Sequence, residues 1–527
     1  MSDDYLNPDS IEWALTHLKR YGDTDIFPIP FEYEAFSYDW PSFKPQIESM
    51  ELSKYQTRPF QRYLIPKQYG GYRPAIQLDP LDSIIYTALA FESADLIENS
   101  RIPIDQKIAC SYRVEIGSQG KFFRENNGWD DYLNYSREIS YSGHYRYVVT
   151  ADIVDFYNQI SHHRIQNALE KAEVEKTRAD NIEGFLTKLT KGQSRGIPVG
   201  PMASIIFSEA CLNDVDHFLT HNDYIHTRYV DDFRIFCKTK ENANKALHDL
   251  IDYLHTTHRF ALQTHKTKIW DVDEFASNNL SDPEEIEMSS LEEKVNRFLS
   301  VTASPYSEAI PIDDSLLDNF NRDILIELFN ACLNHDPLHY GLAKHLLRRA
   351  TALKTVVLMD QVLQNIDKLI PITREVSKYI KATTKPEERE VGLKLISGYR
   401  KSDFLFLPYI QMWILDVLIS KMPVTMSKEI IELCNYSDKQ LGVRPLALLA
   451  MKLNRDDWLR SQKETWQNNK PWDKRAIIWA CQSLPSDELN AWITKIRDTD
   501  DVLDKTIAKA TKHKKNNDMQ KEKKLDS

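Results

Sequence analysis

Two adjacent aspartates, Asp231 and Asp232, are the residues of this sequence with the clearest potential for chemistry. They lie within DYIHTRYVDDFRIFCK (223–238), where residues of high β propensity flank the pair with a period of two. This pattern predicts a tight β-hairpin with both acids at its tip. Aspartate is a poor strand former, so the pair calls for an explanation. Taken alone, it fits an Asp-rich turn as well as a Mg²⁺ site, because one or two carboxylates suffice when substrate phosphates complete the coordination.

A third acid, Asp152, ends the β-rich run RYVVTAD (146–152), and a helix is expected over 164–171. A carboxylate at the end of a strand can meet carboxylates from another strand, which is what a shared metal site requires. The neighbouring His162 and His163 are hydrophilic in context, and we expect them at a helix cap or on the surface rather than on a metal.

Two other segments have the composition of nucleotide-binding elements. Residues 54–73 hold five basic side chains and no acidic one, interleaved with aromatic residues that could stack on bases. Within them, 64–74 predicts a hairpin with a Gly-Gly turn that brings Lys67 near Arg73. GQSRGIPVGP (192–201) predicts a tight loop before a helix, where backbone can approach a nucleotide closely. A solvated hairpin and a plain loop-to-helix junction are the ordinary alternatives.

Length and composition limit the class of protein. A chain of 527 residues predicts two to four domains, and 42% hydrophobic residues is typical of globular proteins. The N-terminal residues MSDDYLNPDS resemble no signal peptide, and no run of eighteen apolar residues occurs, so we expect a cytoplasmic protein without a membrane partner. Six cysteines without a CxxC pair favour a reducing compartment and neither zinc nor disulfides. A net charge of −11 argues against a protein that coats nucleic acid everywhere, although a local basic groove is compatible with it.

Composition also changes along the chain. We expect an N-terminal helical and loop extension over 1–50, the motif-bearing segment over 51–275, and an acidic linker over 276–319. Residues 320–500 predict successive helices separated by prolines, which suggests a HEAT-type repeat solenoid, with an irregular helical bundle as the alternative. The Lys-rich tail, 501–527, is predicted to be disordered.

Taken in order, these motifs resemble the reverse transcriptase family over roughly residues 50–270. The order is a basic hairpin, Asp152 with Phe156-Tyr157, a Gly-Ile-Pro-x-Gly loop and helix, a Tyr-x-Asp-Asp hairpin and a Lys-bearing strand. The resemblance implies an α+β fold, with the fingers and palm of a right-hand polymerase followed here by an all-α, HEAT-like domain.

The resemblance also implies roles for individual residues. Asp152 and Asp231 would hold two Mg²⁺ ions, for which Mn²⁺ may substitute, and Asp232 is the third acid of the site. Lys67 and Arg73 match the fingers residues that touch the triphosphate. Asp155 lies where the family has a residue near the incoming sugar, and Tyr157, which follows Phe156 in the motif, lies where a bulky side chain excludes a 2′-OH. The remaining matches are the loop residues Gly196, Pro198 and Gly200, and Lys266 (alternatively Lys268) as the lysine after the hairpin.

A polymerase core joined to helical repeats is similar to the bacterial antiphage reverse transcriptases of the abortive-infection and defence-associated group. Val199 stands where many mobile-element enzymes have Gln. The resemblance implies DNA synthesis from dNTPs, either RNA-directed or non-templated. Features of the group are priming of the DNA product from a protein hydroxyl, a noncoding RNA as template, and assembly into a homo-oligomer. The alternatives are a retron- or retroelement-type enzyme that copies one specific noncoding RNA, and a non-catalytic helical-repeat scaffold.

Overall fold

The computed structural model describes residues 4–67, 71–125, 128–280, 322–335, 338, 340–385, 388–421, 428–430, 442–462, 465–496 and 499–525. The chain forms two compact units. The first comprises Met1–Thr24, Gln46–Arg58 and Asp82–Ser307, and the second comprises Asp25–Pro45, Pro59–Leu81 and Glu308–Ser527.

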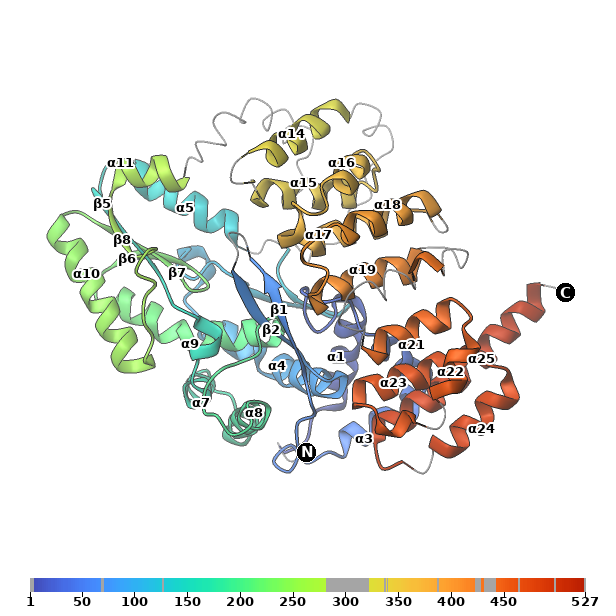
Figure 1. The fold of residues 1–527 in the computed structure, drawn as a ribbon. Coiled ribbons are helices and arrows are strands. Elements are labelled where there is room, and N and C mark those ends of the chain that lie inside the picture. Colours follow the sequence, from blue (N-terminus) through green and yellow to red (C-terminus); the bar gives the residue numbers. More distant parts are fainter. Residues whose placement is uncertain are drawn as a thin grey trace. The chain divides into compact units, whose positions relative to one another are not determined.

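The first unit combines helices with small antiparallel sheets (Figure 1). Its strands are β3 (Val114–Gly117), β4 (Lys121–Phe123), β5 (Tyr147–Asp152), β6 (Ile225–Tyr229), β7 (Asp232–Cys237) and β8 (Lys268–Asp271). Its helices are α1 (Pro8–Tyr21), α5 (Trp129–Tyr141), α6 (Phe156–Gln159), α7 (His162–Lys171), α8 (Lys176–Leu189), α9 (Met202–His221), α10 (Lys240–Tyr253) and α11 (Val272–Phe275), together with most of α4 (Pro80–Ser100).

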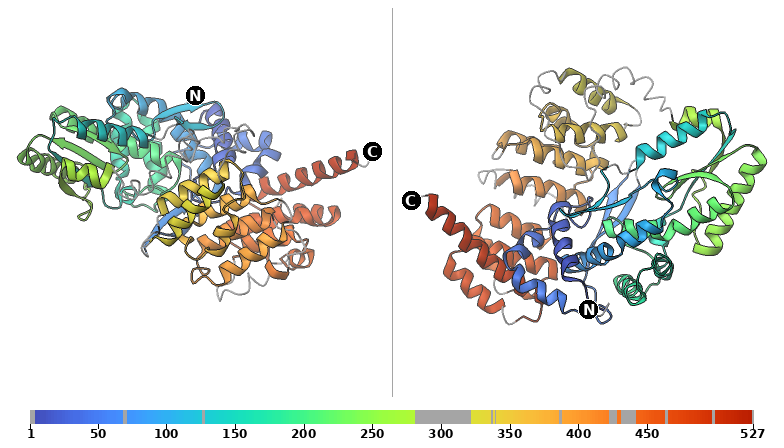
Figure 2. Two further views of the ribbon diagram at one scale, coloured as in Figure 1. Left: turned by 90° about the horizontal axis from the view of Figure 1, so that it is seen from above. Right: turned by 180° about the vertical axis from the view of Figure 1, so that it is seen from behind.

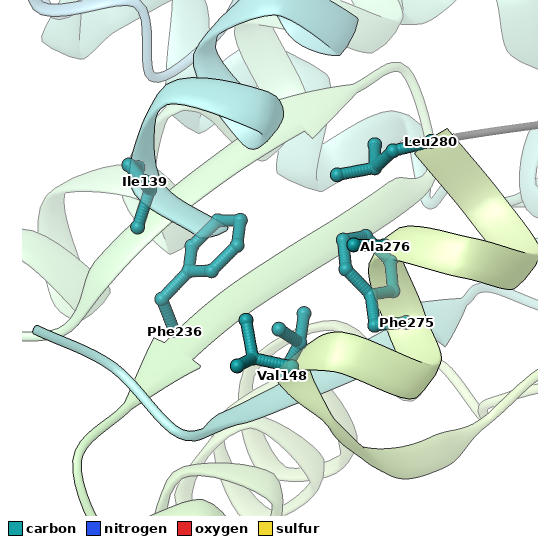
Figure 3. Close-up of a cluster of buried hydrophobic side chains, with 7 residues drawn as sticks. Ile139, Val148, Phe236, Phe275, Ala276 and Leu280 are labelled. Carbon is teal, nitrogen blue, oxygen red and sulfur yellow. The ribbon is translucent and has the colours of Figure 1, made fainter. Parts of the chain in front are cut away.

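The sheet that carries the acids has the strand order β6-β7-β5-β8, and every pair is antiparallel. Val148 on β5 lies opposite Phe236 on β7, and both are buried. They pack with Ile139 of α5 and with Phe275 of α11 (Figure 3). Because side chains alternate along a strand, Asp152 and Asp232 stand on the same face as this core, four residues further along.

Helix α5 can cover this face because of a close backbone approach at its start. Gly128 precedes α5 with φ of 82°, in the left-handed region that favours glycine. A Cβ at this position would lie 1.9 Å from the Cys110 carbonyl oxygen. Any other residue would therefore displace α5 from the sheet.

The helices of the second unit pack in an alternating order. Helices α15, α17, α19, α21, α23 and α25 each contact the next member of that series, while α16 packs against α14 and α18 (Figures 1 and 2). The elements are α2 (Phe31–Tyr38), α14 (Arg322–Asn334), α15 (Tyr340–Ala352), α16 (Met359–Gln364), α17 (Thr373–Thr383), α18 (Arg389–Arg400), α19 (Pro408–Lys421), α21 (Val443–Lys452), α22 (Asp456–Ser461), α23 (Pro471–Ala480), α24 (Ser486–Ile496), α25 (Val502–Leu525), most of α3 (Trp40–Glu48), and the strands β1 (Gln61–Pro66) and β2 (Tyr72–Gln77).

The unit boundaries differ from those expected from composition. Residues Asp25–Pro45 and the β1–β2 hairpin belong with the C-terminal helices rather than with the acid-bearing sheet. The Trp413 indole N–H donates to the Ile26 carbonyl oxygen at 3.1 Å, and the Trp472 indole N–H donates to the Pro59 carbonyl oxygen at 3.0 Å. These contacts join residues several hundred positions apart, which composition along the chain cannot reveal.

A buried ion-pair network completes this attachment. Both oxygens of the Glu32 carboxylate accept from the Arg444 guanidinium at 2.7 Å, and Arg475 reaches Glu32 at 3.3 Å and Asp79 at 2.9 Å. Glu32, Asp79 and Arg475 are fully buried. Burial would raise the pKa of Glu32, but the charges of Arg444 and Arg475 hold it below its ordinary value.

The predicted disorder of 501–527 is wrong for residues 502–525, which form the helix α25. The lysines suggested a solvated tail, but Leu503, Ile507 and Ala510 follow helical spacing and are buried. Among the described residues, no helix is both long and apolar enough to span a bilayer.

The Glu32 network gives a stability prediction. We expect Glu32→Gln to lower the free energy of unfolding by about 3–5 kcal/mol, because it leaves Arg444 without its carboxylate partner and the buried Arg475 with Asp79 alone. Urea denaturation followed by tryptophan fluorescence measures this loss. The matched control is Glu488→Gln, which removes the half-buried carboxylate that pairs with the exposed Arg460 and should cost about 1 kcal/mol or less. Equal losses in the two variants would contradict a structural role for the buried network.

Candidate active site

The register of β5 and β7 brings two of the three predicted acids together. β5 ends at Asp152, β7 begins at Asp232, and these residues are direct partners across the antiparallel pair. Asp231 lies in the turn between β6 and β7, where its carbonyl oxygen accepts from the Ile153 N–H at 3.3 Å. The expected hairpin therefore exists, and its tip lies at the end of β5.

The three acids lie close enough for their charges to affect one another. Burial raises the pKa of Asp232 to about 7, and the charges of Asp152 and Asp231 add to this increase. Lys266 opposes it, because its ammonium lies 2.6 Å from Oδ2 of Asp152. The alternative lysine, Lys268, instead pairs with Glu274 and lies over the ring of Trp270.

The donor set fits a divalent cation held with the help of a substrate. Among the described residues, no three His, Cys, Asp or Glu side chains are grouped closely enough to hold one metal ion. The three acids are thus not a preformed three-ligand cage. Two hard carboxylates with excess charge, Asp152 and Asp232, match the mode in which Mg²⁺ takes one or two carboxylates and completes its shell with phosphates and water.

The hairpin tip is held in a strained conformation by two hydrogen bonds. Val230 has φ of 54°, which is unfavourable for a β-branched residue. Its N–H donates to the Ser111 hydroxyl at 2.9 Å, and its carbonyl oxygen accepts from the Arg228 guanidinium at 2.8 Å. These bonds fix the backbone immediately before Asp231.

Behind the tip, Arg228 belongs to a buried ionic network that the sequence motifs do not indicate. The Arg228 guanidinium donates to Asp216 at 2.9 Å through Nε and lies 3.1 Å from Glu209. Glu209 also binds Arg101 at 2.8 Å and accepts from the Ser111 hydroxyl. Burial would raise the pKa of Asp216, but the Arg228 charge lowers it. A signal for the network was present, since Glu209 and Asp216 are seven residues apart on one helix and therefore share a face.

The Gly-Ile-Pro loop packs against the segment that follows Asp152. Gly196 has φ of 95°, its N–H donates to the Ile160 carbonyl oxygen at 2.8 Å, and its own carbonyl oxygen binds the His162 ring at 2.7 Å. His162 is buried, so of the two adjacent histidines only His163 is on the surface. Further along the loop, Pro198 is buried and Gly200 has φ of 125°.

The loop also contacts the residues expected near the sugar. The Ile197 N–H donates to the Tyr157 carbonyl oxygen at 3.0 Å. The Phe156 ring is buried against Phe260, with centroids 5.5 Å apart. Asp155 is exposed, has φ of 51° and accepts from the Asn158 amide at 2.7 Å. The structure thus brings Asp155, Phe156 and Tyr157 into one substructure with the glycine loop.

Lys67 and Arg73 lie on the β1–β2 hairpin of the second unit. Arg73 is opposite Ile65, and the Lys67 N–H donates to the Gly71 carbonyl oxygen at 2.7 Å. Strand alternation places both side chains on one face of the hairpin, and both are exposed. The predicted hairpin is therefore present, and its two cations are neighbours, but they belong to a different unit from the acids.

Comparison with known proteins gives one family match. Residues 65–301 match the family model described as reverse transcriptase (RNA-dependent DNA polymerase). This segment is a reverse transcriptase domain, and the chain accordingly carries an RNA-directed DNA polymerase of the nucleotidyltransferase class. No curated protein matches the chain.

Solved structures similar to the chain include two telomerases at low similarity. Telomerase from Candida albicans, in complex with a TWJ fragment of telomeric RNA, has a TM-score of 0.31 and 12% identity, over 78% of this chain and 70% of that one. Apo telomerase from Candida tropicalis has a TM-score of 0.32 and 12% identity, over 84% of this chain and 72% of that one. At these values the likeness supports no argument about fold or function.

The strained tip yields a prediction about local opening. In Ser111→Ala, Val230 loses the acceptor for its N–H, a loss of about 1–3 kcal/mol. We expect amide hydrogen exchange across Tyr229–Asp232 to accelerate by about 10-fold or more, since 1.4 kcal/mol corresponds to tenfold. The control is Ser93→Ala, because the buried Ser93 hydroxyl only donates to the Leu89 carbonyl oxygen within α4. Equal exchange at the tip in both variants would contradict the role of Ser111.

The charge of the acid cluster gives a pH prediction for the metal-free protein. The folded-state pKa of Asp232 is raised to about 7, so folding binds a proton between about pH 4 and 7, and stability falls as the pH rises through that window. We expect Asp232→Asn to raise Tm at pH 8 by several degrees and to have little effect at pH 4. Differential scanning calorimetry measures both values. Asp252→Asn, on the exposed side of α10, is the control, and equal Tm changes at the two pH values would contradict the prediction.

Proposed function

We propose that this chain is a reverse-transcriptase-type DNA polymerase of antiphage defence, which joins deoxynucleotides from dNTPs on an RNA template or without a template. The observation that supports it most is the pairing of Asp152 with Asp232 across β5 and β7, within the segment that matches the reverse transcriptase model. Asp231 follows the strained Val230 in the same hairpin.

The proposed chemistry assigns a task to each part of the site. Asp152, Asp231 and Asp232 would hold two Mg²⁺ ions, or Mn²⁺ in their place. When bound, such ions activate the attacking 3′-OH and stabilise charge on the leaving pyrophosphate. Lys266 would orient Asp152 in their absence and release it when the ions bind, because its ammonium occupies Oδ2 of that carboxylate.

The other proposed contacts concern the nucleotide. Lys67 and Arg73 would bind the triphosphate as exposed cations on one hairpin face. Asp155 would lie beside the incoming sugar, and Tyr157 would exclude a 2′-OH. Burial raises the pKa of Tyr157, so this side chain stays a neutral phenol at any working pH. The loop of Gly196, Pro198 and Gly200 supports this segment through the bonds to Tyr157 and Ile160.

The defence role rests on the domain combination. A reverse transcriptase domain is followed, in the described residues from 322 onward, by helices alone, and their alternating contacts are compatible with a HEAT-like repeat. We propose on this basis that the enzyme acts as a homo-oligomer in the cytoplasm, and that its DNA product is attached to a protein hydroxyl. A noncoding RNA that serves as template would instead make it a retron-type enzyme.

The central test is incorporation of labelled dNTPs by purified protein. We expect Asp152→Asn and Asp231→Asn each to reduce incorporation by about 10³-fold or more, since loss of ion binding removes several kcal/mol of transition-state stabilisation. Asp252→Asn, an exposed substitution of the same type, should retain wild-type incorporation. Incorporation that survives in both site variants, or that needs no divalent ion, would overturn the assignment.

A second measurement separates the modes of synthesis. Nucleic acid that co-purifies with the active protein is sequenced, and the protein is analysed by mass spectrometry for attached nucleotides. Attached DNA of random or homopolymeric sequence supports non-templated, protein-primed synthesis. One discrete RNA together with its complement supports the retron-type alternative and overturns non-templated synthesis. Phage plating efficiency with wild type and Asp231→Asn then tests the defence role.

A further inference from the structure

Five cations gather in the second unit, whereas the residues of the acid cluster belong to the first. They are Arg73 on β2, Lys344 and Arg348 on α15, and Arg374 and Lys378 on α17, and we call them the α15–α17 cation cluster. In each helix the two cations are four residues apart, so they lie on one face, one turn from each other. Helices α15 and α17 pack together, and β1 contacts the residues 370–372 that lead into α17.

Two carboxylates lie within the cluster, and the arginines use both. Arg374 pairs with Asp25 at 2.5 Å and with Glu375 at 2.5 Å. Arg348 reaches the same Glu375 at 3.1 Å and thereby connects α15 to α17. Lys344, Lys378 and Arg73 form no ion pair with any carboxylate in the described part of the chain. Five positive charges against two negative ones leave an excess of three, in a chain whose net charge is −11.

The cations also affect one another. Burial lowers the pKa of Lys344, and the charges of Arg374, Arg348 and Arg73 lower it further, against the opposing effect of Glu375. Arg73 therefore lies close enough to α15 for its charge to act there. The cluster is nevertheless accessible, since Arg73 and Lys378 are exposed and Lys344 and Arg348 are half-buried. Folding thus holds accessible like charges together at an electrostatic cost that a bound anion would offset.

We propose that the α15–α17 cation cluster binds the backbone phosphates of a nucleic-acid strand. Each of the two packed helices carries two cations one helical turn apart, about 5.4 Å. A single phosphate is too small to contact all four of them at once. A strand carries evenly spaced phosphates that can meet several of these cations at once. The exposed Arg73 adds a contact from the hairpin. The four helix residues of this site have no task in the proposed catalysis, whereas Arg73 is shared with the proposed triphosphate contact and is left unchanged in the test.

The test uses Lys344→Gln/Lys378→Gln in the full-length protein. These two lysines hold no ion pair in the described structure, and Gln is a good helix former, so the variant should fold. Fluorescence anisotropy with labelled 20-nucleotide DNA and RNA strands, without divalent ions, gives the dissociation constant at several salt concentrations. We expect weaker binding for every sequence and a salt slope smaller by about 1.4, since each phosphate contact on a single strand contributes about 0.7.

Lys385→Gln/Lys470→Gln is the matched control. Both of these lysines are exposed in the same unit, and the net charge changes by the same amount. An equal slope change in test and control variants would overturn the site. A second result would also overturn the proposal. If a free dNTP displaces the labelled strand at a concentration at which inorganic phosphate does not, and the salt slopes of test variant and wild type are equal, the cations bind a triphosphate rather than a strand. Strand binding is measured without divalent ions and without dNTP incorporation, so a failure of the proposed polymerase chemistry would not affect this result.

Discussion

The antiparallel register of β5 and β7 is the constraint on which the rest of the first unit depends. Val148 and Val149 on β5 and Ile235 and Phe236 on β7 are buried on both faces of the sheet, so a slip of one residue would exchange the two cores. The same register sets Asp152 opposite Asp232. Hydrophobic burial along the strands therefore holds together two carboxylates that would otherwise separate.

Charge is distributed differently in the two units. In the first, Arg228 and Arg101 pair with the buried Glu209 and Asp216, and Lys266 pairs with Asp152 of the acid cluster. In the second, arginines pair with the carboxylates of two separate clusters, whereas Lys344 and Lys378 form no ion pair within the described residues. Those carboxylates are Glu32, Asp79, Asp25 and Glu375. Arginine–carboxylate pairs thus contribute to the interior of both units. The charged side chains outside these pairs are the ones that can bind a ligand.

The local elements around the acids were predictable because they depend on short-range pattern. The hairpin around Asp231, the strand that ends at Asp152 and the Gly196 loop each carry periodicity or turn residues within about ten positions. Arg228 was not recognised, since its role depends on Glu209 and Asp216 from a separate helix. The position of the hairpin of Arg73 in the helical unit was also missed, because sequence pattern contains no record of contacts across hundreds of residues.

The same limits applied at the end of the chain. Lysine-rich composition masked the buried stripe of Leu503, Ile507 and Ala510, which only becomes meaningful when α23 and α24 are present to cover it. The sequence offers both Lys266 and Lys268 as the lysine beside the acid cluster. Lys266, in the turn before β8, pairs with Asp152, whereas Lys268 pairs with Glu274. Side-chain direction in such a turn depends on tertiary contacts rather than on propensity.

The interleaved path of the chain has a consequence for any attempt to divide this protein. Cutting within 276–319 would strip Ile26, Glu32 and Pro59 of their partners Trp413, Arg444 and Trp472, and would expose a buried carboxylate together with apolar surface. The C-terminal helices therefore cannot be exchanged between homologues by recombination within 276–319 alone. Recombination would have to transfer residues 25–45 and 59–81 along with these helices, so these three stretches are expected to be inherited as one module.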